Sequence, residues 1–170
     1  MKKVLLLFLA NTLLFCFGGS ASAQTWNRIV PLISTCEQLK EFLPIKECNG
    51  ASSKLDTSEY YLKISYSTQT CQEGEQWNVP KGTVIRVLFN PKPFIRLTDY
   101  GDVKDYVMKP EDDLPDYKTY TNEKLGIGLT VLDDENHGEL IQNIFLFPST
   151  ENKNKFKCGQ KVVKKKSRKK

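Results

Sequence analysis

The sequence predicts an α+β domain in which a short N-terminal helix packs on one face of an antiparallel sheet of about five to six strands. The strongest signal is a nearly unbroken apolar run over residues 83–89, bounded by Pro80, Gly82 and Pro91. Such a run is typical of a strand inside a sheet. Several other short segments alternate between apolar and polar residues, which is the period of a strand. One helical segment precedes the strands, without repeated strand–helix–strand units.

The N-terminus has the features of a secretory signal peptide. Two lysines precede an apolar stretch over residues 4–17, and small residues follow at 21–23, as signal peptidase requires. We expect cleavage before Gln24. We expect no lipid on Cys16, because a phenylalanine and not a small residue precedes it.

The predicted organisation is a signal peptide at 1–23, a single domain at 24–160 and a disordered basic tail at 161–170. We therefore expect an exported protein, periplasmic or extracellular, with no transmembrane span after cleavage.

Charge is distributed unevenly along the chain. The formal net charge is +5, but the tail contains seven basic residues and no acid, and the signal peptide contains two lysines. Acidic residues outnumber basic ones between these ends, so a site specific for nucleic acid is not expected in the domain. The tail has little to bury and should be disordered. The tail either contacts an anionic surface electrostatically or only increases solubility. The residues that would make the electrostatic contact are Lys164, Lys165, Lys166, Arg168, Lys169 and Lys170.

The mature chain has four cysteines, Cys36, Cys48, Cys71 and Cys158. An even number in an exported protein predicts two disulfides. A metal site is less expected, because the sequence has no C-x-x-C pair. A hairpin centred on residues 56–59 would bring position 48 close to Cys71. This favours Cys48–Cys71 and leaves Cys36 to pair with Cys158. We expect no cofactor and no metal.

The first predicted element is a helix of about two to three turns. Ser34 and Glu37 form an S-x-x-E capping box. Apolar residues follow at helical spacing and Pro44 ends the helix, so its apolar side is expected to face the core.

The remaining elements are strands and loops. We expect a short strand near 52–55 and a strand with one solvated face at 60–66. Residues 93–97 contain a proline close to Pro91 and are predicted to form an edge piece. The acidic segment 98–116 is predicted to be a long excursion. An antiparallel meander then follows over residues 117–121, 127–132 and 140–147.

No group of residues predicts a reaction. His137, the single histidine, lies in an Asn-His-Gly turn without a hydrolase motif around it. The acids of the 98–116 excursion match no calcium loop, and we interpret them as solvated. Whether the protein is an enzyme stays open, with a preference for a non-catalytic role.

Tyrosine side chains on a solvated sheet face are the candidate binding surface. They are Tyr61 and whichever of Tyr117 and Tyr120 lies opposite the core. The leading hypothesis is an exported non-catalytic domain that binds another envelope macromolecule, either a protein or an anionic component. One alternative is a secreted hydrolase or carbohydrate-active enzyme that uses acids of residues 98–116. The other is a structural envelope protein held by its basic tail. The oligomeric state is not predicted.

A resemblance to known proteins lies in two motifs, the Trp-Asn-Arg-Ile-Val-Pro-Leu-Ile-Ser-Thr of residues 26–35 and the Trp-Asn-Val-Pro of residues 77–80. These resemble a family of uncharacterised exported bacterial proteins over most of the mature chain up to Cys158. The order of a helix opened by Ser-Thr and then an antiparallel sheet is similar to β-lactamase-inhibitor-like domains, which include small outer-membrane lipoproteins of the barrel-assembly machinery. The resemblance implies an envelope or secreted binding module and carries over no functional residues.

Overall fold

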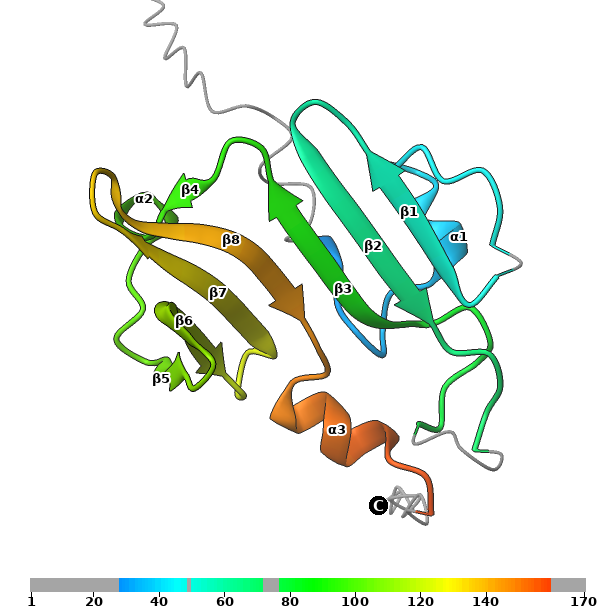
Figure 1. Ribbon diagram of the computed structural model, residues 1–170. Coiled ribbons are helices and arrows are strands. Elements are labelled where there is room, and N and C mark those ends of the chain that lie inside the picture. Colours follow the sequence, from blue (N-terminus) through cyan, green and yellow to red (C-terminus); the bar gives the residue numbers. More distant parts are fainter. Residues whose placement is uncertain (1–27, 49, 72–76, 160–170) are drawn as a thin grey trace, which may run out of the picture.

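The computed structural model describes residues 28–48, 50–71 and 77–159. These form one antiparallel sheet of eight strands, with the order β1-β2-β3-β8-β7-β6-β5 and with β4 also paired to β8 (Figure 1). The strands are β1 (Ser52–Asp56), β2 (Tyr60–Tyr66), β3 (Val84–Pro91), β4 (Ile95–Arg96), β5 (Val107–Glu111), β6 (Leu114–Asn122), β7 (Ile127–Asp134) and β8 (Gly138–Leu146). The predicted signal peptide and basic tail lie outside the described residues.

The described helices are short: α1 (Cys36–Leu39), α2 (Leu97–Tyr100) and α3 (Thr150–Phe156). The fold is therefore mainly β, and the predicted α+β class with five to six strands is wrong. The difference arises because α1 has only four residues and because β5 forms within the acidic segment that was predicted to be a loop. The short helices α2 and α3 were also not predicted.

The N-terminal helix is shorter than predicted because its hydrogen bonding tightens after the first turn. The Phe42 amide donates to the Leu39 carbonyl at 3.1 Å, a bond over three residues instead of four. The capping box is also displaced by one residue. Thr35 caps the helix, and its amide donates to the Gln38 side chain at 2.9 Å, whereas the Ser34 hydroxyl accepts the Val30 amide.

Most predicted strands are confirmed. β1 and β2 form the expected hairpin, β6, β7 and β8 form the expected meander, and β3 lies inside the sheet between β2 and β8. β5 escaped prediction because all five of its residues are exposed. A strand without a buried face carries no alternating hydrophobic pattern.

The hydrophobic core lies on one side of the sheet, which we call the inner face. Alternate side chains of the middle strands are buried there, together with α1 and the segment before it, and Leu39 is only 1% exposed. The segment before α1 is tied to β3, because the Leu32 amide donates to the Val84 carbonyl at 2.7 Å. Core members on the sheet are Leu62, Ile64, Tyr66, Val84, Val87, Phe89, Leu129, Val131, Ile141, Ile144 and Leu146.

The turn between β6 and β7 docks on the end of β8. Gly126 has φ of 73°, a conformation that favours glycine. Its carbonyl accepts the Phe147 amide at 2.9 Å. A Cβ at position 126 would lie 2.8 Å from the Ser149 nitrogen and closer still to the Phe147 carbonyl. This close approach requires a residue without a side chain.

Two disulfides are present, Cys36–Cys48 and Cys71–Cys158, with Cα–Cα distances of 5.7 and 5.4 Å. Disulfide formation is confirmed, but the predicted pairing is wrong. The short α1 lets the chain fold back so that Cys48 meets Cys36. Cys71 is brought to the C-terminal segment because the Asn78 amide donates to the Phe156 carbonyl at 2.6 Å and Trp77 bridges Lys157.

Candidate binding face

The two faces of the sheet differ in what lies on them. α1 packs against the inner face, and Figure 1 shows it next to β1 on the far side of the sheet. The opposite side, here called the outer face, carries the side chains that alternate with the core residues. Across β2, β3 and β8 these side chains are polar, basic or half-buried apolar, and no described helix contributes core residues on that side. The outer face is therefore the broad surface that the described part of the chain leaves to solvent.

A row of polar side chains crosses the outer face. Tyr61 pairs with Asn90, and Thr130 pairs with Asn143. The Asn90 amide nitrogen donates to the Asn143 side-chain oxygen and joins β3 to β8. The side-chain oxygen of Asn90 is buried and has no partner among the described residues. Unsatisfied buried oxygens are uncommon, so this row contains one polar atom whose hydrogen bonding the described residues do not complete.

The neighbouring row is partly apolar. Lys63 pairs with Leu88, and Leu88 pairs with Phe145. Phe145 then faces Gly128, which has no side chain. Leu88 and Phe145 are half-buried. The centre of the outer face thus offers shallow apolar contact between polar rows and no projecting apolar group.

Basic side chains are concentrated on the part of the outer face that β1, β2 and β3 form. Lys54 on β1 pairs with Lys63 on β2, and Arg86 pairs with Ser65, two residues further along β2. The acid on this part of the face, Asp56, is bound to Lys92 with a separation of 2.6 Å between nitrogen and oxygen. We call Lys54, Lys63 and Arg86 the basic cluster.

The structure separates the three candidate tyrosines. Tyr61 pairs with Asn90 and Tyr117 pairs with Leu132, and both lie on the outer face. Tyr120 lies on the inner side, where its hydroxyl is 3.1 Å from Glu139. Burial, and next the hydrogen bond to Glu139, raise the pKa of Tyr120. Tyr117 is therefore the second surface tyrosine that the sequence left undecided.

Glu139 belongs to a polar cluster at the inner edge of the core. Lys118 contacts Asp133 at 2.8 Å and Glu139 at 3.0 Å, and these two carboxylates raise the pKa of the lysine. A lysine held between two acids is a poor base at neutral pH. The cluster joins β6, β7 and β8 and offers no unpaired reactive group.

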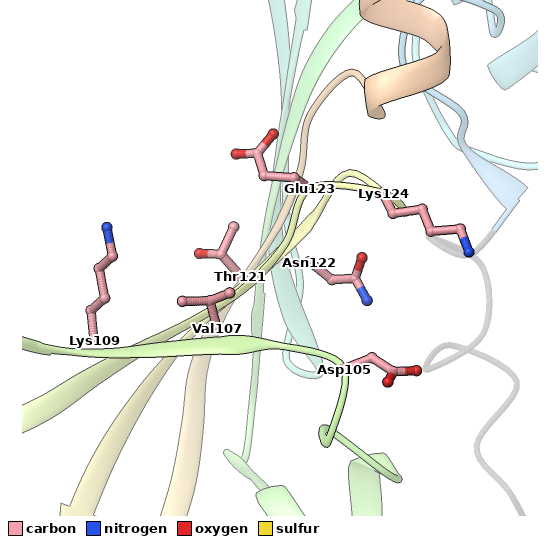
Figure 2. Close-up of a pocket in the computed structure, with 7 residues that line it drawn as sticks. All are labelled: Asp105, Val107, Lys109, Thr121, Asn122, Glu123 and Lys124. Atoms are coloured by element: carbon pink, nitrogen blue, oxygen red, sulfur yellow. The ribbon is translucent and has the colours of Figure 1, made fainter.

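A hollow of about 440 Å³ opens beside the exposed strand β5 (Figure 2). In Figure 2 Lys109 projects at one end, and Lys124 and Asp105 project at the other. Glu123, also on its wall, is engaged in an ion pair with Lys153. The lining residues are Asp105, Val107, Lys109, Thr121, Asn122, Glu123 and Lys124. Acidic and basic side chains both line the wall, so the hollow has no strong preference for anions or for cations.

The same hollow bears on the hydrolase alternative. That alternative requires two or more acids of residues 98–116 in one pocket beside an aromatic residue. Among the described residues that line the hollow, Asp105 is the one acid from this segment, and none is aromatic. Glu111 instead accepts from the Thr119 hydroxyl across the β5–β6 pair.

A second hollow, of about 600 Å³, adjoins the Cys71–Cys158 disulfide. It is lined by Trp77, Lys153, Asn154, Lys157 and Cys158. None of the described residues on its wall is an acid or a histidine, and the described part of the chain contains no group of three or more metal-binding side chains.

His137 is exposed in the turn between β7 and β8, as predicted. Its ring nitrogen lies 2.7 Å from Asp134, whose oxygen also accepts the His137 amide at 2.8 Å. The hydrogen bonds from this histidine, and next those from nearby amides, lower the pKa of Asp134. The pair closes a turn, which is a structural role.

Sequence reasoning missed the basic cluster and the Asn90–Asn143 bridge. The cluster was detectable, because residues on opposite arms of a predicted hairpin face each other at positions set by the turn. The Asn90–Asn143 bridge was not detectable, because it depends on the long-range pairing of β3 with β8. The six tail residues proposed as an electrostatic contact, Lys164, Lys165, Lys166, Arg168, Lys169 and Lys170, lie outside the described residues.

The described part of the chain contains no helix with the length and hydrophobicity needed to cross a lipid bilayer. Comparisons with family models, with curated proteins and with solved structures gave no match for this chain.

Proposed function

We propose that this protein is an exported, non-catalytic domain that binds another macromolecule of the cell envelope on its outer sheet face. One observation carries the proposal: the inner face is covered by α1 and the N-terminal segment, whereas the outer face is left open across β1, β2, β3 and β8. An antiparallel sheet with one solvated face is common. Here that face also carries Tyr61, basic side chains and a buried oxygen that has no partner among residues 28–48, 50–71 and 77–159.

Export is supported by the signal-peptide features of residues 1–23 and by two disulfides, which are typical of oxidising compartments. Membership in the exported bacterial family suggested by the residue 26–35 and 77–80 motifs stays a prediction. The same is true of a role for the basic tail in attachment to the envelope.

The test is retention of envelope material on the immobilised mature chain. Tyr61→Glu places a charge on the outer face, and Ile33→Glu places the same charge at a site that is 53% exposed outside this face. We expect Tyr61→Glu to reduce retention several-fold and Ile33→Glu to leave it unchanged. Equal loss in both variants, or loss in Ile33→Glu alone, contradicts the proposal.

A further inference from the structure

The basic cluster on the outer face is unfavourable for the isolated chain. Lys54 and Lys63 are directly opposite each other on neighbouring antiparallel strands. Side chains in this arrangement have Cβ atoms about 4.5–5.5 Å apart, and like charges there are destabilising. Arg86 on β3 is diagonal to Lys63, because it pairs with Ser65, two residues along β2. Residues in diagonal positions are about 7–8 Å apart. Three cations therefore lie within a small area.

No described carboxylate neutralises this cluster. None of the three basic side chains takes part in an ion pair among the described residues. Asp56, the nearest acid in the strand order, is held by Lys92. A concentration of unpaired positive charge on a solvated face attracts an anionic ligand.

The side chains around the cluster favour a carbohydrate over other anions. Ser52 and Ser65 face each other beside it, and Tyr61 lies next along β2 on the same face. Serine hydroxyls exchange hydrogen bonds with sugar hydroxyls, and a tyrosine ring offers an apolar face with a polar edge. A bilayer is less suitable, because the exposed apolar side chains Val107, Met108 and Leu114 lie at the opposite end of the sheet.

We propose that the basic cluster binds an anionic polysaccharide in an extended conformation, with Lys54, Lys63 and Arg86 contacting its acidic groups and Tyr61 stacking on a sugar ring. The inference rests on the proposed function, which assigns binding to the outer face, and it adds the class of ligand. Neighbouring strands are about 4.8 Å apart, so the cluster spans a short stretch of polymer. Lys63 pairs with Leu88 on β3, and a lysine stem packs favourably along such an apolar side chain while the ammonium stays in solvent.

The experiment measures the affinity of the full mature chain for polygalacturonate by calorimetry. The variants are Lys63→Glu/Arg86→Glu, its neutral form Lys63→Gln/Arg86→Gln, and the control Lys81→Glu. Lys81 is exposed in the turn before β3 and undergoes the same change of charge. Both double variants should fold, since they relieve repulsion at Lys54, and thermal melting checks this. The basic tail is common to all the chains, so its contribution cancels in the comparison.

We expect the double charge reversal to weaken binding by roughly tenfold or more and Lys81→Glu to change it by less than about twofold. Neutral dextran should not bind, and affinity for polygalacturonate should fall steeply with salt. Tyr61→Ala should weaken binding to polygalacturonate but not to polyglutamate.

Equal losses in Lys81→Glu and the double variants would overturn the inference. Tighter binding of polyglutamate or of phosphatidylglycerol vesicles than of polygalacturonate would also overturn it. In these cases the proposed function still stands if Tyr61→Glu abolishes retention of envelope material while Ile33→Glu does not, so the two failures are distinguishable.

Discussion

Lys54 and Lys63 are opposite each other on the outer face of the β1–β2 hairpin, and the nearest described acid on that face, Asp56, is held by Lys92. Repulsion between these two like charges destabilises the folded state. It predicts that one of the two lysines is dispensable for folding. Lys54→Thr should raise the free energy of unfolding by about 0.2–1 kcal/mol, measured by urea denaturation. The gain should shrink in high salt, where the repulsion is screened. A loss of stability in Lys54→Thr would contradict this reading of the hairpin.

The two disulfides should differ in their contribution to stability. Their sequence separations are 12 residues for Cys36–Cys48 and 87 for Cys71–Cys158. Loop-closure entropy gives about 3 kcal/mol for the shorter loop and about 4.6 kcal/mol for the longer one. Peptide mapping without reduction should recover these two pairs. A peptide that joins Cys48 to Cys71 would show the pairing to be wrong.

Two glycines with similar backbone angles provide a matched pair. Gly126 and Gly138 have φ of 73° and 76°, but only Gly126 lies against the Phe147 and Ser149 backbone, whereas a Cβ at Gly138 meets open space. Gly138→Ala should lower the free energy of unfolding by about 1 kcal/mol, from backbone strain alone. Gly126→Ala should lower it several times as much, because backbone atoms must also shift. Equal costs in chemical denaturation would rule out the close approach.

Tyr100 should make stability sensitive to alkaline pH. Burial, and next the hydrogen bond with Tyr106, raise its pKa above the ordinary value of 10.0. The folded state then holds the proton more tightly, so this contribution is fully present below pH 10 and is lost as pH rises above it. Tyr100→Phe should be somewhat less stable at pH 7 and should lose less stability between pH 10 and 11. An unchanged pH slope would show that Tyr100 is not the responsible group.

The elements that were predicted correctly are those in which the pattern of apolar and polar residues matches the pattern of buried and exposed positions. The alternation over residues 60–66 placed β2 correctly, because its inner residues Leu62 and Ile64 are buried and its outer residues are not. β5 gave no such signal, since both of its faces are exposed. The helix length was overestimated because apolar residues at helical spacing also suit the tight turns after Leu39.

The disulfide pairing and the outer face required information from distant parts of the chain. Cys71 meets Cys158 because Trp77 bridges Lys157, a contact between residues far apart in the sequence. Tyr117 could not be separated from Tyr120 until the β6–β7 register fixed which of them faces the core. The Lys54–Lys63 pair, in contrast, follows from a local hairpin and was accessible to sequence reasoning.

Site-specific photo-cross-linking in cells that produce the protein tests the outer face most directly. A photoreactive phenylalanine analogue replaces Tyr61 or Ser65 on the outer face, or Ile33 outside it, in otherwise native chains. We predict cross-linked envelope material from positions 61 and 65 and none from position 33. Cross-linking from position 33 alone, or equally from all three positions, would contradict it.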